Sequence, residues 1–530
     1  MYDFVAVRLN RFSAAGQQTL LKASQRGIEK ESLRVSPAGT IAQTPHPLAL
    51  GATLTNPHIT TDYSEALLEL ITPPCADNAA TLLFLRDTHQ FVYSKLAASE
   101  YVWAASMPCT LEGEDSIPIG YYGSSNAGRM KTIYRLGLGH RYGKIMQVIA
   151  GVHFNYSLED RFWTAYQILE GESGSLRSFK DRHYFGMIRN LQRHGWLIPY
   201  LFGASPAVGT TFLQDHRPRQ LQPFDDHSYY GPYATSLRMG DIGYQNKKEG
   251  KTGVRICYDS LDSYVSSLER AISTPCPTYA RIGVKVDGEY RQLNANILQI
   301  ENEYYSSVRA KQPLLADETH PSQALRARGV GYIELRSLDV NAYDPLGIHE
   351  SQLYFLEAFI LFCLLNDSPP IAAAERAEID WNQSAAAHQG RDPSLLLRRH
   401  GHTQLLRTWA SELCNGMREL CTILDEGLPN RPYSSALETQ TEVVHDTDQT
   451  PSARMLADMH QQRETFFEFT RRLSHQHRDY FQALPPNPTQ QTFFENLAVQ
   501  SINQQHALET AIQEDFDHYL ARYSWAGNQQ

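Results

Sequence analysis

Two glutamates in the segment at residues 27–35 are spaced so that they could bind one metal ion together. The segment, GIEKESLRV, reads as a short β-strand, and in a strand Glu29 and Glu31 project from the same face, about 6.5–7 Å apart. Two such carboxylates repel each other unless a cation lies between them or one of them takes a proton. Mg²⁺, which prefers oxygen ligands, would relieve that repulsion. The alternative interpretation is a solvated edge strand with a charged face.

A second pair of charged residues has the same spacing. Residues 331–340 alternate cleanly and predict a strand with Glu334 and Arg336 on one face. This pair could be an ordinary cross-strand ion pair, which contributes up to about 1 kcal/mol. Alternatively, Glu334 is a metal ligand and Arg336 binds a phosphate or a carboxylate through its planar guanidinium group.

Glu69 lies in a segment, residues 60–74, that permits two interpretations. A helix would place Asp62, Glu65 and Glu69 on one face, which could simply be the wet side of an amphipathic helix. A strand from 66 to 72 would leave Glu69 as the lone charge in an apolar run. Both interpretations put Glu69 in or beside the core, where an unpaired carboxylate is costly and needs a partner.

Two further strands are predicted to carry polar side chains. In residues 147–157, His153 and Asn155 share the more polar face, and the alternation around Gln299 and Glu301 predicts another strand. A lone histidine is more often a hydrogen-bonded core residue than a metal ligand. His153 is therefore a candidate only if the other polar strands join the same sheet.

The glycine-rich segments match no standard nucleotide or nucleophile motif. Residues 129–140 are basic and glycine-rich and could present cations to an anionic ligand. GLGHRYGKI (137–145) has neither the Walker A spacing nor a Ser or Thr after its lysine. GASPA (203–207) lacks the last glycine of a nucleophile elbow. If the protein uses ATP, it does so without a P-loop.

The polar strands together favour one kind of chemistry. An antiparallel sheet can pack one face on helices and leave the other face concave and polar. Several carboxylates and a histidine on such a face would suit two or three Mg²⁺ ions, with substrate phosphates completing the coordination. This arrangement favours phosphoryl transfer from ATP, in which the protein mainly positions groups and neutralises charge. The acceptor stays open at this point.

Helices must support this sheet. We predict them at residues 10–26, 78–98, 158–200 and 261–273, and from 350 to near 523 the periodicity is helical with no strand signal. The chain is therefore expected to be an α+β protein. Its two regions would be a catalytic region with an antiparallel sheet at 1–345 and a C-terminal helical region at 346–530 that packs on it.

Composition argues against several classes of protein. The net charge of −10 favours neither nucleic acid nor anionic membranes as partners. We see no signal peptide at the start and no apolar run long enough to span a bilayer. The seven cysteines are scattered, without a CxxC pair, which fits reduced thiols. We expect a cytoplasmic monomer that binds small molecules, with no nucleic-acid or membrane partner.

Nine motifs in order along the chain point further than any single one of them. They are GIEKESLRV (27–35), TDYSEALLELITP (61–73), MPC (107–109), GYYGSSNAGRMKTIYRLGLGHRYG (120–143), GVHFNYS (151–157), LFGASPA (201–207), LRMGDIGY (237–244), NANILQIENEYYSSVR (294–309) and YIELRSLDVN (332–341). Together they resemble proteobacterial glutamate–cysteine ligase, also called γ-glutamylcysteine synthetase. From residue 350 onward the resemblance rests mainly on length and pattern.

The resemblance implies a fold and a reaction. The core would be like that of glutamine synthetase, with a curved antiparallel sheet that forms a funnel. ATP would phosphorylate the γ-carboxylate of glutamate, and the α-amine of cysteine would attack the acyl phosphate. The products would be γ-glutamylcysteine, ADP and phosphate, in the first step of glutathione synthesis. Mg²⁺, two or three ions, would be the cofactor, with Mn²⁺ as a substitute and ATP as co-substrate.

The resemblance also implies roles for individual residues. The metal ligands would be Glu29, Glu31, Asp62, Glu69, His153 and Glu334. Glu334 and Arg336 would be the catalytic residues, with Arg336 stabilising the transferring phosphoryl group. The substrate pocket on the cysteine side would contain Tyr63, Tyr134, Leu138, Arg238, Tyr244 and Tyr305. The nucleotide side would contain Ile149, Asn155 and Arg336.

Three alternatives remain beside this assignment. A related ligase could join glutamate to another amine, and loss of the tyrosine and arginine pocket would favour it, yet those residues are present. A non-catalytic metal- or nucleotide-binding relative would be expected to have lost metal carboxylates, and none is missing. A metal-dependent hydrolase would turn over without ATP.

Overall fold

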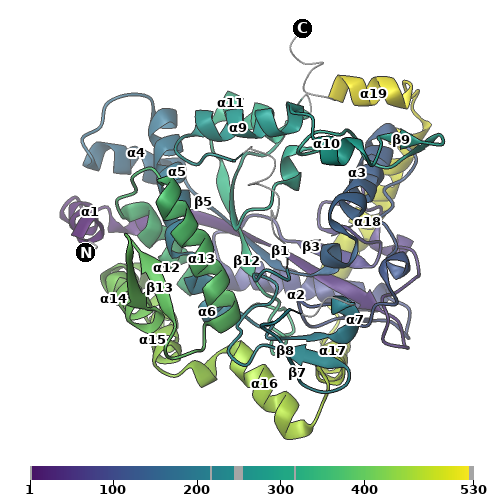
Figure 1. The fold of residues 1–530 in the computed structure, drawn as a ribbon. Coiled ribbons are helices and arrows are strands. Elements are labelled where there is room, and N and C mark those ends of the chain that lie inside the picture. Colours follow the sequence, from purple (N-terminus) through teal and green to yellow (C-terminus); the bar gives the residue numbers. More distant parts are fainter. Residues whose placement is uncertain (1–2, 215–217, 244–254, 316–317, 524–530) are drawn as a thin grey trace.

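An antiparallel sheet forms the centre of the protein. The computed structural model describes residues 3–214, 218–243, 255–315 and 318–523. The sheet has the strand order β11-β12-β5-β1-β3-β2, with the short β4 paired to the end of β1 (Figure 1). Its strands are β1 (Ser24–Val35), β2 (Ile59–Thr61), β3 (Leu67–Ile71), β4 (Tyr101–Val102), β5 (Val152–Leu158), β11 (Val308–Lys311) and β12 (Tyr332–Leu338). The twelve-residue β1 is the longest of these and is paired on both sides.

The register of the strands gathers charged and polar side chains on one face. The cross-strand pairs on this face are Glu29–His153, Glu31–Glu69, Glu334–Asn155 and Glu334–Arg309. Because side chains alternate between the two faces, the residues between them point the other way. That second face is mainly apolar: Ile28 and Leu335 each lie opposite Phe154, and all three are fully buried. Strand β1 also places the buried Arg26 and Lys30 on this face.

Helices cover the apolar face. The sheet contacts α2 (Asn78–Lys95), α5 (Leu176–His194) and α6 (Leu197–Phe202), while α12 (Glu350–Leu365) packs behind them against α2 and α5. The α12 helix is buried almost all round, as expected of a helix with apolar residues on every side. A buried ion pair of 2.7 Å between Arg26 Nη2 and Glu357 Oε2 links β1 to α12.

The other elements surround this two-layer core. The helices are α1 (Asp3–Ala14), α3 (Asn126–Tyr142), α4 (Asp160–Leu169), α7 (Thr210–Leu213), α9 (Leu261–Ser273), α10 (Pro277–Ala280), α11 (Pro321–Arg328), α13 (Ala373–Gln389), α14 (Leu406–Asp425), α15 (Pro432–His445), α16 (Pro451–Gln462), α17 (Phe466–Ala483), α18 (Pro488–Thr510) and α19 (Phe516–Tyr523). The short strands are β6 (Ala207–Gly209), β7 (Gln222–Pro223), β8 (Ser228–Tyr230), β9 (Lys285–Val286), β10 (Glu289–Tyr290), β13 (Leu396–Arg399) and β14 (His402–Leu405). In the view of Figure 1, α12 to α15 lie at the left, α16 lies at the bottom, and α3, α18 and α19 lie at the right.

Lys30 lies between Glu29 and Glu31 in β1 but points to the opposite face. It is buried, and its Nζ lies 3.2 Å from Nε2 of His89 on α2. Burial lowers the pKa of Lys30 to about 7. The same strand therefore presents carboxylates to one side and an amine to the other.

Most of the long elements agree with the sequence predictions. The strands at 27–35 and 331–340 are confirmed as β1 and β12, and the helices at 78–98 and 261–273 as α2 and α9. Of the two interpretations of residues 60–74, the strand is correct. The region 158–200 is helical as predicted, in the form of α4, α5 and α6. Among the described residues, none of the helices is both long and apolar enough to cross a membrane.

Other predictions were wrong. The N-terminal helix is α1, which ends at Ala14 before Gly16 takes a φ of +65°, and not a helix over 10–26. The strand predicted at 147–157 begins only at Val152, after a short 3₁₀ turn. The chain around Gln299 and Glu301 is irregular and is not a strand. The C-terminal region also contains a hairpin, β13–β14, where no strand was expected.

The face of the sheet that the helices cover should carry much of the stability of the sheet. Truncation of the fully buried Ile28 to alanine leaves a cavity against Phe154, so Ile28→Ala should lower the free energy of unfolding by about 2–5 kcal/mol. The measurement is denaturant unfolding followed by circular dichroism. The matched control is Ile168→Ala, because Ile168 is 71% exposed and should cost less than about 0.5 kcal/mol. Equal effects of the two substitutions would contradict the assignment of the core.

Candidate active site

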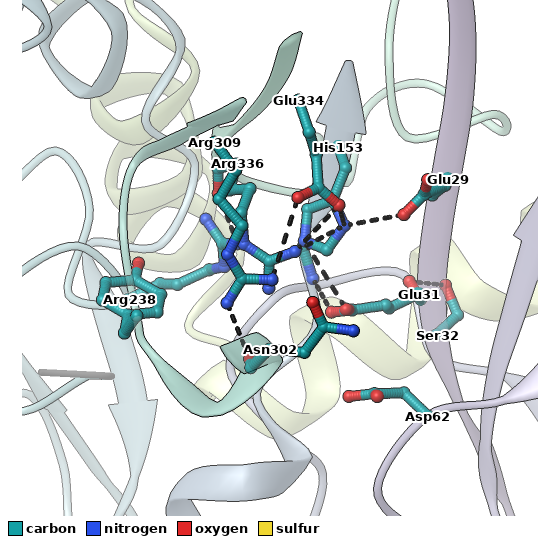
Figure 2. Close-up of polar contacts among 12 residues, drawn as sticks. Glu29, Glu31, Ser32, Asp62, His153, Arg238, Asn302, Arg309, Glu334 and Arg336 are labelled. Atoms are coloured by element: carbon teal, nitrogen blue, oxygen red, sulfur yellow. Dashed lines mark hydrogen bonds and ion pairs between the residues drawn. The ribbon is translucent and has the colours of Figure 1, made fainter. Parts of the chain in front are cut away.

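Three side chains from three adjacent strands converge on the polar face of the sheet. One ligand atom each from Glu29 (β1), Glu69 (β3) and His153 (β5) lie within 4.8 Å of one another. Figure 2 shows His153 between Glu29 and Glu334, with Glu31 on the adjoining side. Carboxylate oxygens and an imidazole nitrogen at such separations can share one cation.

Each glutamate of β1 has its own partners. Glu29 Oε1 accepts a hydrogen bond of 2.8 Å from Asn155 Nδ2, and its Oε2 lies 3.2 Å from His153 Nδ1. Glu31 Oε2 accepts a hydrogen bond of 2.7 Å from the backbone N–H of Gly151, and its Oε1 lies 3.6 Å from His153 Nε2. His153 thus contacts both carboxylates, and its ring is held between them.

Burial and mutual repulsion keep part of this cluster from ionising easily. Burial, together with the charges of Glu29 and Asp62, raises the pKa of Glu69 well above that of a free glutamate. Burial also raises the pKa of Glu31. For Glu29, burial and the charge of Glu334 favour a raised pKa, but the hydrogen bond with His153 outweighs them and brings the pKa of Glu29 below the usual value. The side of the cluster formed by Glu31 and Glu69 is therefore the side that most needs a cation.

The other end of the polar face is rich in cations. Glu334 is fully buried; its Oε1 accepts a hydrogen bond of 3.0 Å from Arg336 Nη1, and its Oε2 lies 3.5 Å from Lys311 Nζ and 3.8 Å from Arg309 Nη1. Although burial opposes ionisation, the charges of Arg336, Lys311 and Arg309 hold the pKa of Glu334 well below its usual range. Arg336 Nη1 also lies 3.5 Å from His153 Nδ1. A phosphate placed here would meet several positive groups.

Asp62 lies apart from the converging cluster. Its side chain is 47% exposed, and one carboxylate oxygen lies 3.8 Å from Arg135 Nη2. Its backbone carbonyl accepts hydrogen bonds from Tyr122 Oη at 2.7 Å and from Arg135 Nε. The guanidinium of Arg135 in turn lies 4.3 Å from the centre of the Tyr122 ring. Figure 2 shows the Asp62 carboxylate below Glu31 and separate from His153.

A cavity beside the cluster contains most of the predicted substrate residues. Helix α3 and the loops beyond the sheet line it, and the lining residues are Glu31, Asp62, Tyr63, Tyr134, Arg135, Leu138, Gln147, Ile149, His153, Arg238, Asn302, Glu303, Tyr305, Arg309 and Arg336. Tyr63, Tyr134, Leu138, Arg238 and Tyr305, which the resemblance placed in one pocket, thus line one cavity. Tyr244 lies outside the described residues. Asn155 is not part of the lining, although its Nδ2 donates to Glu29 Oε1 in the adjoining cluster.

Five lining residues were not among the predicted site residues. They are Arg135, Gln147, Asn302, Glu303 and Arg309. Arg309 lies opposite Glu334 on the neighbouring strand β11. This pairing is a long-range contact that the sequence does not reveal. Glu303 accepts hydrogen bonds from Arg141 and Tyr142 of α3, which fix the loop rather than leave a free carboxylate.

Gln147 is the lining residue with unused hydrogen-bonding groups. Its side-chain oxygen and nitrogen are both buried, and neither has a hydrogen-bond partner among the described residues. A buried polar group without a partner costs free energy, so an amide in this state next to a cavity is suited to bind a polar ligand.

Gln299 and Glu301 do not belong to the polar face. Glu301 accepts a hydrogen bond of 2.6 Å from Ser322 and lies 3.4 Å from His320 Nδ1, in a buried cluster with α11. Gln299 donates to the carbonyl of Tyr134 on α3 at 3.2 Å. A Cβ on Gly137 would lie 2.2 Å from the Gln299 amide oxygen, so the glycine lets this loop pack against α3.

Comparisons with known proteins agree with one another. A family model described as glutamate–cysteine ligase matches residues 9–386. The chain is 47% identical over 523 residues to the glutamate–cysteine ligase of Pseudomonas aeruginosa strain LESB58, which covers 99% of this chain and 98% of that protein. It is 45% identical over 521 residues to the glutamate–cysteine ligase of Alcanivorax borkumensis, with 97% and 98% covered.

Solved structures are similar as well. The crystal structure of a glutamate–cysteine ligase from Francisella tularensis in complex with AMP matches with a TM-score of 0.88 and 34% identity, over 96% of this chain and 98% of that chain. A bifunctional glutathione synthetase from Pasteurella multocida matches with a TM-score of 0.74 and 23% identity, over 93% of this chain and 58% of that one. The second similarity concerns the fold alone.

The raised pKa values of Glu31 and Glu69 predict that cation binding releases protons. A carboxyl with a raised pKa retains its proton to higher pH, and a divalent cation binds the ionised form. Binding of Mg²⁺ should therefore release protons and become tighter as the pH rises above the usual pKa of a glutamate. The measurement is titration calorimetry in buffers with different ionisation enthalpies.

Glu69→Gln is the comparison variant for this measurement. It removes one of the two carboxyls and should release fewer protons than the wild type when Mg²⁺ binds. A wild-type protein that binds Mg²⁺ with the same heat in every buffer would contradict the prediction.

Proposed function

The chain belongs to the glutamate–cysteine ligase family, and from this premise we propose that the polar face of its sheet is the site of catalysis. The enzyme joins the γ-carboxylate of L-glutamate to the α-amine of L-cysteine and converts ATP to ADP and phosphate, in the first step of glutathione biosynthesis. The observation that carries the assignment to this face is the convergence of Glu29, Glu69 and His153 beside Arg336.

The reaction needs two steps because a carboxylate oxygen is a poor leaving group. In the first step, an oxygen of the glutamate γ-carboxylate attacks the γ-phosphorus of ATP, and the bond to ADP breaks. In the second, the neutral α-amine of cysteine attacks the acyl carbon, phosphate leaves with the carbon–oxygen bonding pair, and the nitrogen loses a proton. Negative charge on the phosphoryl oxygens is the main obstacle in the first step.

The residues at the cationic end of the sheet face are suited to offset that charge. The Arg336 guanidinium is oriented by Glu334 on one edge and lies next to His153. A planar guanidinium can donate two parallel hydrogen bonds to a phosphoryl group, and a fixed donor needs no reorganisation during the reaction. We therefore assign Arg336 to the transferring phosphoryl group, with Glu334 as the second catalytic residue.

The acidic cluster fits Mg²⁺, or Mn²⁺ as a substitute. Glu29, Glu69 and His153 converge, Glu31 and Glu334 adjoin them, and Glu334 Oε2 is buried without a hydrogen-bond partner among the described residues. Asp62, across the cavity, completes the proposed set of ligands. When bound, the ions would neutralise the phosphate charge of ATP. The high pKa of Glu69 supports the assignment, because a cation would remove the repulsion that raises it.

We assign the cavity beside the cluster to the amino-acid substrates. The pocket on the cysteine side would contain Tyr63, Tyr134, Leu138, Arg238 and Tyr305, joined by Tyr244. Arg238 is the cation that could bind the α-carboxylate of the acceptor. The nucleotide would contact Ile149, Asn155 and Arg336, and the AMP complex of the Francisella tularensis relative supports a nucleotide site in proteins of this fold.

We extend the proposal to the architecture around the site. One face of the sheet is covered by helices and the other adjoins the cavity, which supports a glutamine-synthetase-like funnel. The catalytic region would comprise residues 1–345 and the helical region 346–530. Seven free cysteines support action of the enzyme in the reducing cytoplasm, as a monomer on small-molecule substrates.

The assay that tests the function is ADP release by the purified protein with Mg-ATP and L-glutamate, with and without L-cysteine. The expected result is ADP formation that rises strongly with cysteine, together with γ-glutamylcysteine identified by mass. ADP formation that requires glutamate but does not change with cysteine would support the acyl phosphate step and indicate that another amine is the acceptor. Absence of ATP turnover by folded, Mg²⁺-binding protein would overturn the proposal.

Removal of one charge from the acidic cluster should abolish most of the activity without unfolding the protein. Glu29→Gln and Glu334→Gln should each lower kcat/KM by at least about 100-fold, because a neutral amide is a much weaker ligand for a divalent cation. Steady-state kinetics over a range of Mg²⁺ concentrations would measure this, with Glu438→Gln as control because Glu438 is an exposed residue of α15, outside the sheet. Near-normal activity of either variant would remove that residue from the proposed set of ligands.

A lysine should not replace Arg336. Arg336→Lys keeps the charge but loses the planar pair of donors, so we expect kcat to fall by about 100-fold or more while the melting temperature changes little. Single-turnover kinetics of ADP formation would isolate the phosphoryl step. The control is Arg431→Lys at a side chain that is 66% exposed. Retention of more than half of the activity would show that Arg336 acts only as a point charge.

A further inference from the structure

Asp339 is a buried carboxylate to which no role in the reaction has been given. It follows β12 directly, three residues after Arg336, and its side chain is completely inaccessible to solvent. Its Oδ2 accepts hydrogen bonds from the backbone N–H of Ala204 at 2.9 Å and from Ser205 Oγ at 2.6 Å. Its Oδ1 accepts a hydrogen bond of 2.9 Å from Ser236 Oγ. One carboxylate thus connects the catalytic strand to two loops outside the sheet.

The second of these loops carries Arg238. The two loops run side by side, because the backbone N–H of Leu237 donates to the carbonyl of Ser205 at 2.7 Å. The Ser205 segment is the LFGASPA motif, which is not a nucleophile elbow and has no other role in the site. Its serine instead donates to Asp339, which lies 3.8 Å from Arg238 Nη1.

Three features fix the guanidinium of Arg238 at the wall of the cavity. Its Nη2 donates a hydrogen bond of 2.8 Å to the backbone carbonyl of Arg336. It also lies across Gly151, where a Cβ would be only 2.1 Å from Nη2. Asp339 is the carboxylate on the other edge. The backbone N–H of the same glycine donates to Glu31. The segment before β5 therefore contacts both Arg238 and a carboxylate of the acidic cluster.

The charges of Asp339 and Arg238 depend on each other. A charged group removed from water is costly unless a partner of opposite charge is close, and loss of one partner leaves the other uncompensated. Burial raises the pKa of Asp339, while Arg238 and the hydroxyl and amide donors oppose that shift. Removal of the carboxylate would leave Arg238 without the acid that lies 3.8 Å from its Nη1. The guanidinium could then turn toward other acceptors in the cavity, such as Glu31, on whose pKa its charge already acts.

We propose that Asp339 is a positioning residue for acceptor binding, which acts through Arg238 so that the guanidinium is held ready for the α-carboxylate of the amino-acid acceptor. This inference rests on the proposed function, in which Arg238 belongs to the pocket for cysteine. It assigns to the buried Asp339, Ser205 and Ser236 a part in the affinity for cysteine, although none of them lines the cavity.

The first test is the kinetics of Asp339→Asn, a substitution of nearly equal volume. We expect the KM for cysteine to rise at least about tenfold, because Arg238 without the Asp339 carboxylate no longer keeps its orientation. The KM for ATP should stay within about twofold of wild type. An unchanged KM for cysteine in a folded Asp339→Asn protein would overturn the proposal.

Asp425 provides a matched control for the loss of a buried aspartate. Its two carboxylate oxygens accept hydrogen bonds from the backbone N–H groups of Tyr433 and Ser434, both at 2.9 Å, in the helical region between α14 and α15. Asp425→Asn should lower the melting temperature and leave the KM values for cysteine, glutamate and ATP unchanged. A similar rise in the KM for cysteine in this control would show that general loss of stability, and not Asp339, explains the effect.

A double-mutant cycle separates action through Arg238 from a purely structural role. Arg238→Lys should itself raise the KM for cysteine, because lysine lacks the planar donors. If Asp339 acts through Arg238, the double variant Arg238→Lys/Asp339→Asn should be no worse than Arg238→Lys within about twofold. Fully additive effects would overturn the proposal and leave Asp339 as a structural connection between loops.

Two further measurements keep the outcome decisive. If Asp339→Asn does not fold, Ser236→Ala removes one donor to Oδ1 and should raise the KM for cysteine several-fold, and no change would overturn the proposal. If the wild-type enzyme releases ADP without dependence on cysteine, the proposed acceptor is wrong. The same cycle measured with the true amine acceptor would then test the role of Asp339 independently.

Discussion

Repulsion among carboxylates that share one face of a sheet is the constraint on which the rest of this structure depends. An ion removed from water loses several kcal/mol of solvation, so acidic side chains on a sheet face must find cations or hydrogen-bond donors. The protein meets this requirement unevenly. Arg336, Lys311 and Arg309 compensate Glu334, whereas Glu31 and Glu69 have raised pKa values. The resulting gradient, from a cation-rich end to a cation-deficient end, suits a substrate that carries both phosphates and metal ions.

The supporting elements keep this costly face in a fixed geometry. Both neighbours of β1 are antiparallel strands, and the apolar face lies on α2, α5 and α6, with the almost fully buried α12 behind. The ion pair between Arg26 and Glu357 connects β1 to this helical layer. Tyr433 Oη of α15 donates to the same Glu357 oxygen at 2.8 Å. Free energy gained by apolar burial on one face therefore offsets the cost of charges on the other.

The sequence allowed prediction of what a single strand or helix determines, and little of what depends on pairing. Alternation with period two identified β1 and β12 and placed Glu29 with Glu31 and Glu334 with Arg336 on common faces. Which strands lie side by side is a long-range property, so the contribution of Arg309 was not foreseen. The roles given to single residues came from the resemblance to a family, because spacing alone left the amine acceptor open.

The errors have physical causes as well. The polar and apolar alternation around Gln299 and Glu301 imitates a strand, but the loop is held by side-chain hydrogen bonds to α3 and α11, which no local pattern reveals. The alternation from 147 onward includes a 3₁₀ turn before β5 begins. In the first fourteen residues, Val5, Leu9 and Phe12 face the core at helical spacing, and the prediction placed the helix too late.

The opposite orientation of Lys30 has a consequence for how this strand can change over evolutionary time. A slip of the chain by one position would turn an ammonium group toward the polar face of the sheet and bury two carboxylates against α2. Insertions and deletions within β1 should therefore be eliminated by selection even where individual substitutions are accepted. Single residues of the strand can be replaced, but the number of residues between Ser24 and Val35 must stay constant, because it determines which side chains face the polar side of the sheet.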